Sequence, residues 1–148
     1  MRVADWGAER GEGVLVTLGL GSCVAIMLHD PVASAGAMAH ILLPSRSLAR
    51  DQAHPAKFPE TAVPFLVERL RALGAVPARL VAKLAGGASM FSQLLQPGTI
   101  QMGERTVVAS RAALRAAGIP VAREAAGGTV GRTIRFEVAT GAVDARCV

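Results

Sequence analysis

Residues 17–23 read Thr17-Leu18-Gly19-Leu20-Gly21-Ser22-Cys23, a glycine-rich stretch that ends in a cysteine. Apolar residues stand on both sides of it, Val14-Leu15-Val16 before and Val24-Ala25-Ile26-Met27-Leu28 after. Short apolar runs separated by glycines indicate two strands joined by a tight turn, because glycine reaches backbone angles that other residues avoid. The sequence therefore predicts that Cys23 lies at the mouth of this turn, where a thiol can be held at a surface.

A histidine follows Cys23 at a spacing that permits contact. His40 stands seventeen residues later in a second apolar run, and Asp30-Pro31 predicts a turn between the two runs. An antiparallel hairpin would make Cys23 and His40 cross-strand neighbours. A cysteine beside a histidine and a hydroxyl is the arrangement of a nucleophilic hydrolase. The alternative stays open, because a lone cysteine is more often a small buried hydrophobe and a histidine in an apolar strand is more often a core residue.

The remaining pattern predicts two main helices and several further strands. Helical spacing of apolar residues indicates helices at 59–74 and 104–117. Strands are expected at residues 13–18, 24–29, 37–43, 80–84, 119–124, 133–139 and 143–147. This order favours an α+β fold, with mixed, largely antiparallel β-sheets in a sandwich-like core and the two helices packed on it. At 148 residues and 51% hydrophobic composition, the chain is predicted to form one domain over residues 1–148.

Composition disfavours several classes of protein. The longest apolar runs are too short to cross a bilayer, and the N-terminus lacks the apolar stretch of a secretory signal, so we expect a cytoplasmic protein with no membrane insertion. Two cysteines are too few for a disulfide framework, and Cys147 is expected to be a buried core thiol. The net charge is +5, but aromatic residues make up 3% and the arginines are dispersed. This balance disfavours nucleic-acid binding and suits an acidic protein partner.

Several short motifs follow the cysteine in a specific order. They are Asp30-Pro31, His40 with Leu43-Pro44, Lys83, Gly86-Gly87-Ala88-Ser89-Met90, Gly103-Glu104-Arg105, Gly127-Gly128 and Gly131-Arg132. In these motifs, together with residues 17–24, the chain resembles the chemoreceptor glutamine deamidases of bacterial chemotaxis, the CheD family. The resemblance runs from about Val3 to the C-terminus. No single motif is decisive, but their order and spacing together are specific.

The resemblance implies an enzyme of the cysteine hydrolase type, a protein-glutamine glutaminase, that needs no cofactor. It implies that Cys23 is the nucleophile, His40 its acid and base, and Thr17 the group that orients the imidazole. Backbone amides around Gly21 and Ser22 are candidates for stabilising the oxyanion. The substrates implied are glutamines on the cytoplasmic helices of methyl-accepting chemotaxis receptors, which become glutamates with release of ammonia.

The resemblance also suggests where substrate and partners bind. Lys83, Gly86 and Gly87 are expected to line the substrate groove, since glycine lets another backbone approach closely. Some members of the family bind a phosphatase of the CheC type, which is therefore a candidate partner. Three positions depart from the family pattern: Ala39, Ala85 and Thr106 stand where asparagine, phenylalanine and asparagine are common. These departures bear on substrate affinity and groove shape more than on the chemistry.

Two other functions compete with the deamidase. The first is a binding module that regulates a CheC-type phosphatase or a receptor with weak or vestigial catalysis, which the altered positions and the basic surface would suit. The second is a metal site formed by Cys23 and His40. Structural zinc needs four organised ligands, and two cysteines with three histidines offer few, so no metal is expected.

Overall fold

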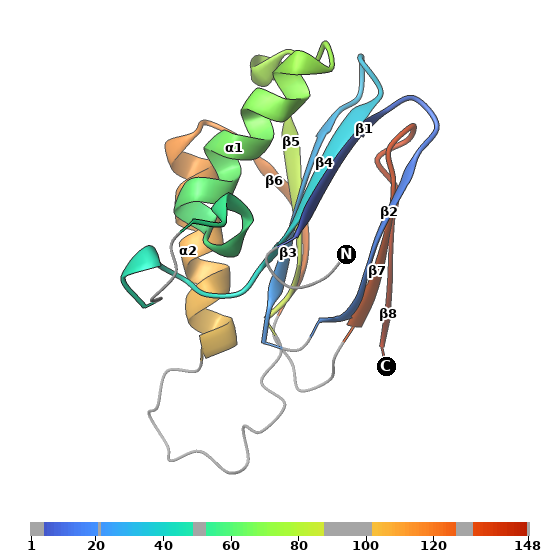
Figure 1. Ribbon diagram of the computed structural model, residues 1–148. Coiled ribbons are helices and arrows are strands. Elements are labelled where there is room, and N and C mark those ends of the chain that lie inside the picture. Colours follow the sequence, from blue (N-terminus) through green and yellow to red (C-terminus); the bar gives the residue numbers. More distant parts are fainter. Residues whose placement is uncertain (1–4, 21, 49–52, 88–101, 127–131, 148) are drawn as a thin grey trace.

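The computed structural model describes residues 5–20, 22–48, 53–87, 102–126 and 132–147, and they form three layers (Figure 1). The central layer is a five-stranded sheet with the order β1 (Trp6–Arg10), β4 (Ala35–Ile41), β3 (Val24–Asp30), β5 (Val81–Gly86) and β6 (Val121–Ala126). One outer layer is a three-stranded sheet with the order β2 (Val14–Leu20), β7 (Arg132–Glu137) and β8 (Val143–Cys147). Two helices form the other outer layer. The predicted α+β architecture is confirmed.

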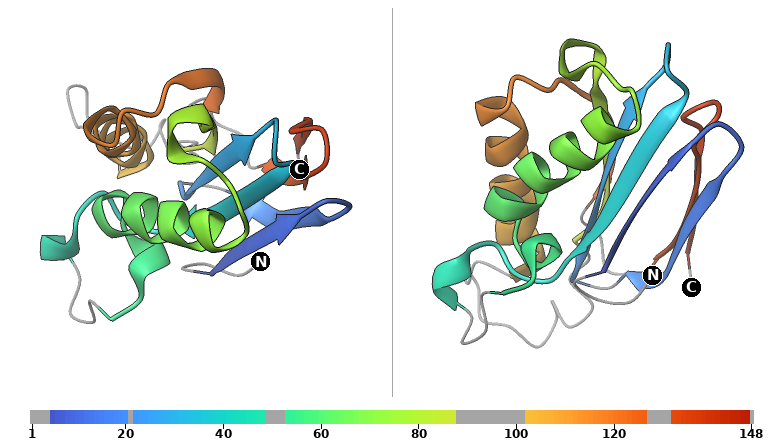
Figure 2. Two further views of the ribbon diagram at one scale, coloured as in Figure 1. Left: turned by 90° about the horizontal axis from the view of Figure 1, so that it is seen from above. Right: turned by 45° about the horizontal axis from the view of Figure 1, so that its top comes forward.

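The helices α1 (Pro59–Ala72) and α2 (Met102–Ala116) cover the outer face of the five-stranded sheet (Figure 2). The buried side of α1 is formed by Val63, Leu66 and Leu70, which follow the helical spacing that the sequence predicted. Short 3-10 turns at Arg46–Leu48, Pro55–Lys57 and Pro77–Arg79 lie in the connections around α1. Neither helix has the length and apolar character needed to cross a bilayer.

The central strand β3 separates two hydrophobic cores. Every residue of β3 is buried, and alternate side chains point to opposite faces of the sheet. Ile26 and Leu28 pack with the helices in what we call the helix-side core. Ala25 and Met27 pack with residues of the three-stranded sheet in what we call the inter-sheet core. A side chain placed at an odd-numbered position of β3 therefore points toward the three-stranded sheet.

The two strands that flank the cysteine turn belong to different sheets. β2 pairs with β7, whereas β3 pairs with β4 and β5. Cys23 therefore lies where the chain crosses from one layer to the next. In Figure 1 the end of β2 and the start of β3 lie at the lower end of the molecule. The predicted hairpin of β3 and β4 is confirmed, with Ala25 opposite His40 in the antiparallel register.

A bulge near the end of β2 changes which of its residues point inward. Thr17 lies opposite Ile134 and Leu20 lies opposite Arg132, so three steps along β2 match two steps along β7. Without this extra residue, Thr17 and Leu20 would face opposite sides of the strand, because they are an odd number of residues apart. Both side chains are instead fully buried. The bulge thus places a hydroxyl and the last apolar residue of β2 on the same side.

Polar contacts fix the end of the molecule that lies far from Cys23. The carboxylate of Asp30 is buried and accepts hydrogen bonds from the backbone N–H groups of Val32, Ala33 and Val76 and from the guanidinium of Arg79. Burial alone would raise the pKa of Asp30, but these four donors hold that pKa well below its usual range. The ionised carboxylate thereby ties the β3–β4 turn to the segment that follows α1.

Three features of the fold were not predicted. β1 was missed because Gly7, Ala8, Glu9 and Arg10 show no alternation of apolar and polar residues, and the strand is defined by its pairing with β4. The pairing of β5 with β6 is parallel. The loop expected at residues 45–59 contains two of the 3-10 turns. Residues 89–102, which the pattern left unassigned, lie outside the described residues except for Met102 at the start of α2.

Candidate active site

A hydrogen bond between the two sheets joins Thr17 to His40. The hydroxyl Oγ1 of Thr17 lies 2.8 Å from Nδ1 of the imidazole. Both side chains are buried, with exposed fractions of 0% and 3%. Thr17 reaches this position from β2 by regular alternation with Leu15, which is also buried. His40 reaches it from β4 on the inner face of the five-stranded sheet. The contact fixes the orientation of the imidazole ring.

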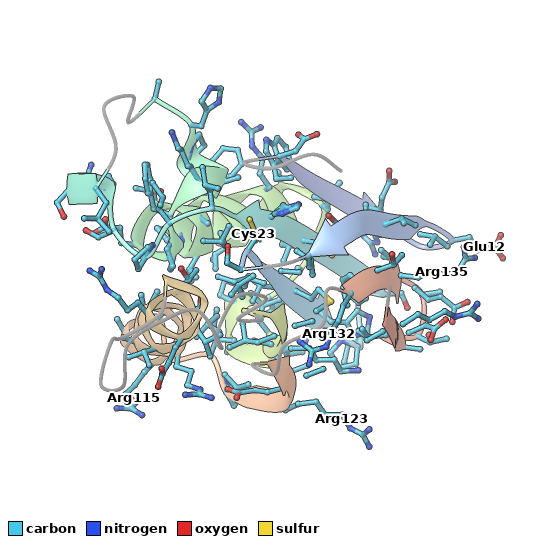
Figure 3. The ribbon with its side chains drawn as sticks, turned by 90° about the horizontal axis from the view of Figure 1, so that it is seen from below. Glu12, Cys23, Arg115, Arg123, Arg132 and Arg135 are labelled. Atoms are coloured by element: carbon cyan, nitrogen blue, oxygen red, sulfur yellow. The ribbon has the colours of Figure 1, made fainter. Side chains whose placement is uncertain are left out.

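Cys23 lies on the same side of the central sheet as His40. It precedes Ala25, the residue opposite His40, by two positions, and its side chain packs against the inter-sheet core. Side chains two residues apart on a strand share a face, so Cys23 and His40 are diagonal neighbours across the β3–β4 pair. Figure 3 shows Cys23 near the centre of the lower end of the molecule.

The other two histidines lie elsewhere. Nε2 of His29 is 2.8 Å from the carbonyl oxygen of Val138, at the opposite end of β3 from Cys23. His54 is exposed beside one of the 3-10 turns. The fold thus brings His40, of the three histidines, to the cysteine end.

Partial burial controls the protonation of Cys23. The thiol is free of any disulfide and intermediate in exposure. Burial raises its pKa above the ordinary thiol value, because the thiolate loses solvation when water is removed. At neutral pH the group is therefore a thiol rather than a thiolate. A reaction that uses the sulfur as nucleophile needs a base to remove its proton, and the imidazole of His40 is the base that the fold places nearby.

Gly86 and Gly87 form a close support for Cys23. The N–H of Gly87 donates a 2.8 Å hydrogen bond to the carbonyl oxygen of Cys23. Gly86 has φ of +101° and Gly87 has φ of +69°, which are left-handed conformations that favour glycine. A Cβ on Gly86 would overlap the carbonyl of Cys23, and one on Gly87 would overlap Val107 of α2. The two glycines therefore hold the backbone of Cys23 against the end of β5.

Other residues expected at the site lie at different distances from it. Ser22 is exposed beside Cys23, and Gly21 lies outside the described residues. Lys83 does not lie beside Cys23, since its Nζ donates a 2.7 Å hydrogen bond to the carbonyl of Gly141 in the β7–β8 turn. The role of Lys83 in binding substrate stays a prediction.

The sequence reasoning gave no role to Arg132, although it named the residue in a motif. Arg132 is the first residue of β7, and its guanidinium donates a 3.3 Å hydrogen bond to the carbonyl of Gly86. This contact joins the three-stranded sheet to the glycine pair that supports Cys23. The Gly131-Arg132 motif was the available signal in the sequence. The carbonyl of Gly86 is 46 residues away in the chain, so no local pattern indicates that Arg132 contacts it.

The three departures from the family pattern lie in different places. Ala39 points into the helix-side core, on the opposite face of β4 from His40. Ala85 lies in the inter-sheet core. Thr106 is buried on α2. Ala85 is therefore the departure that shares the sheet face of the cysteine and the histidine.

The described residues contain no cluster of three or more histidine, cysteine or carboxylate side chains that could hold a metal ion. Cys147 ends β8, but its side chain lies outside the described part of the chain. Its expected burial stays a prediction.

Comparison of the sequence with known proteins finds relatives over most of the chain. Residues 42–147 match the family model described as CheD chemotactic sensory transduction. A probable chemoreceptor glutamine deamidase CheD of Caldanaerobacter subterraneus is 42% identical over 90% of this chain and 83% of its own length. The chemoreceptor glutamine deamidase CheD of Thermotoga maritima is 42% identical over 94% of this chain and 85% of its own length. A probable chemoreceptor glutamine deamidase CheD 2 of Geobacter metallireducens is 47% identical over 91% of this chain and 84% of its own length.

The contact between Gly86 and Cys23 leads to a prediction for stability. Gly118 also has positive φ, of +73°, but no atom lies within 4 Å of a Cβ built on it. Gly118→Ala should therefore lower the free energy of unfolding by about 1–2 kcal/mol through backbone strain alone. Gly86→Ala should lower it by about 3 kcal/mol, since the Cys23 carbonyl must also move. Urea unfolding of both variants measures the difference, and equal losses would contradict the proposed support.

The burial of Cys23 leads to a prediction for its reactivity. In a Cys147→Ser background, the rate of alkylation by iodoacetamide should rise with pH, with a midpoint above the ordinary thiol pKa of about 8.5. The same protein in concentrated urea provides the control, because the exposed thiol should then titrate near that ordinary value. A midpoint in the folded protein below the midpoint in urea would contradict this account.

Proposed function

The chain belongs to the CheD family, and we propose that it is a chemoreceptor glutamine deamidase in which Cys23, His40 and Thr17 act together. The observation that carries this proposal is the buried 2.8 Å contact between Thr17 and His40 on the face of the sheet that also bears Cys23. The names of the relatives support the substrate class, since they describe deamidases of chemoreceptors. The proposed substrates are glutamines on the cytoplasmic helices of methyl-accepting receptors.

The first half of the reaction forms a thioester. Nε2 of His40 removes the proton from the thiol of Cys23, and the thiolate attacks the side-chain amide carbon of the glutamine. The carbonyl oxygen becomes an oxyanion, for which backbone N–H groups of the Gly21-Ser22-Cys23 turn are the proposed donors. The protonated imidazole then gives its proton to the amide nitrogen. The carbon–nitrogen bond breaks, and ammonia leaves.

The second half hydrolyses the thioester. His40, now neutral, takes a proton from water, and the resulting hydroxide attacks the thioester carbon. The carbon–sulfur bond breaks, and the imidazole returns its proton to the sulfur of Cys23. The sum is one glutamine and one water converted to one glutamate and one ammonia, with the enzyme unchanged.

Thr17 has a defined part in this scheme. For Nε2 to act as the base, Nδ1 must carry the hydrogen of the neutral ring, so Nδ1 donates to the Oγ1 of Thr17. A hydroxyl selects this tautomer and fixes the ring, but it carries no negative charge to stabilise the imidazolium. Burial of Cys23 raises the pKa of its thiol, so the proposed reaction starts from the protonated sulfur.

A direct assay tests the proposed function. The purified chain is incubated with cytoplasmic domains of chemoreceptors from the same organism, and ammonia release is measured together with a mass gain of ~1 Da per modified site. Cys23→Ala should abolish both, and Cys147→Ala should leave both unchanged. Full activity in Cys23→Ala would refute the mechanism. Receptor binding with no ammonia release would favour instead a binding module. The binding of a CheC-type phosphatase and the cytoplasmic location are not tested by this assay and stay predictions.

A matched pair of variants tests the part played by Thr17. Thr17→Val removes the hydroxyl at nearly constant volume and should lower kcat by about 10- to 100-fold, which is less than the loss expected from removing the base itself. Thr17→Ser keeps the hydroxyl and should retain most of the activity. The kcat of both variants is measured with saturating receptor. If Thr17→Val and Thr17→Ser had equal kcat values, the hydrogen bond would have no catalytic role.

A further inference from the structure

A cleft opens between β6 and β8, the strands at the edges of the two sheets. Its volume is about 470 Å³. Alanines make up four of the positions that line it. The lining includes Lys83, Ala85, Arg123, Ala125, Ala142 and Ala145. We call this space the β6–β8 cleft.

The β6–β8 cleft leads to the cysteine end of the molecule. Its floor follows β5 from Lys83 to Ala85, and the next residues, Gly86 and Gly87, hold the backbone of Cys23. Three residues of a strand span about 10 Å. A segment of the substrate bound in the cleft would therefore end close to Cys23, where the target glutamine of the same substrate would react. Figure 3 shows Arg123 and Arg132 on the same side of Cys23, viewed from that end.

The β6–β8 cleft has an excess of positive charge. Arg123 lies opposite Lys83 in the register of β6 with β5, and its side chain is exposed. No carboxylate in the described part of the chain forms an ion pair with Arg123. Glu124 also borders the cleft, but its carboxylate pairs with Arg111 at 2.6 Å. The positive charges of Arg123 and Lys83 are thus left for a ligand.

We propose that the β6–β8 cleft is a docking groove for an acidic segment of the substrate protein, on the same polypeptide as the target glutamine. This inference rests on the proposed function. Carboxylates of the segment would lie by Arg123 and Lys83, and its apolar groups would contact the alanines. This arrangement gives Lys83 a place in substrate binding at a distance from the cysteine, while its ammonium retains the hydrogen bond to Gly141. Arg132, whose guanidinium bonds the carbonyl of Gly86, adds a further positive charge between the cleft and Cys23.

A charge at the rim of a binding surface acts mainly on association. It raises the rate of encounter and weakens with salt, and it does not enter the chemical step. Removing Arg123 should therefore raise KM for a receptor domain and leave kcat unchanged. The expected rise is about two- to five-fold for Arg123→Gln, and larger for Arg123→Glu.

The control for this experiment is Arg71→Gln on α1. Arg71 is exposed and pairs with Glu68 at 3.5 Å, away from the cleft, so this variant makes the same change in net charge. Steady-state ammonia release from receptor cytoplasmic domains gives kcat and KM for each protein at low and high salt. Arg71→Gln should match the unmodified chain at low salt. At 0.5 M NaCl, where the Debye length is short, the KM values of all the proteins should converge.

Each failure of this experiment has a separate meaning. If Arg123→Gln and Arg71→Gln have the same KM at low salt while ammonia is released, the docking groove is refuted and the proposed function stands. If Arg123→Gln lowers kcat with KM unchanged, Arg123 acts on the site itself and the docking role is refuted. If the unmodified chain releases no ammonia, the proposed function fails and the docking proposal fails with it.

Discussion

The hydrogen bond between Thr17 and His40 is the constraint on which the candidate site depends, because it joins two separate sheets. His40 belongs to the central sheet and Thr17 to the outer three-stranded sheet. The imidazole therefore has its orientation only when the two sheets are packed at the correct separation and register. The bulge in β2 follows Thr17 and turns Leu20 to the same inward side, so that β2 stays packed on the inter-sheet core beyond this contact. The site is in this sense a property of the packing between layers.

Other polar contacts between the sheets serve the same packing. His29 and Lys83 each bond a carbonyl of the β7–β8 turn, at the end far from the cysteine. Arg132 bonds the carbonyl of Gly86 at the near end. The contact of Lys83 is a charge-assisted hydrogen bond, which is stronger than a neutral one. These contacts give the docking of the small sheet a defined register, which apolar packing alone specifies weakly.

The sequence predicted well the features that depend on local patterns. The two helices and most strands follow apolar periodicity, and the β3–β4 hairpin that brings His40 toward Cys23 follows from the turn at Asp30-Pro31. The division of the strands between two sheets could not be predicted in this way, because it depends on pairings between residues far apart in the chain. Thr17 needed the family resemblance for the same reason. As an isolated threonine in a strand it has no local signal, and its partner lies 23 residues away.

The partial burial of Cys23 has a consequence for the durability of the enzyme. Peroxide and other oxidants react with the thiolate form of cysteine, and the fraction of thiolate at neutral pH falls as the pKa rises. A cysteine that rests as a neutral thiol is therefore a poor target for oxidation. The burial that in the proposed mechanism calls for a base thus also protects the sulfur from permanent damage while it is idle.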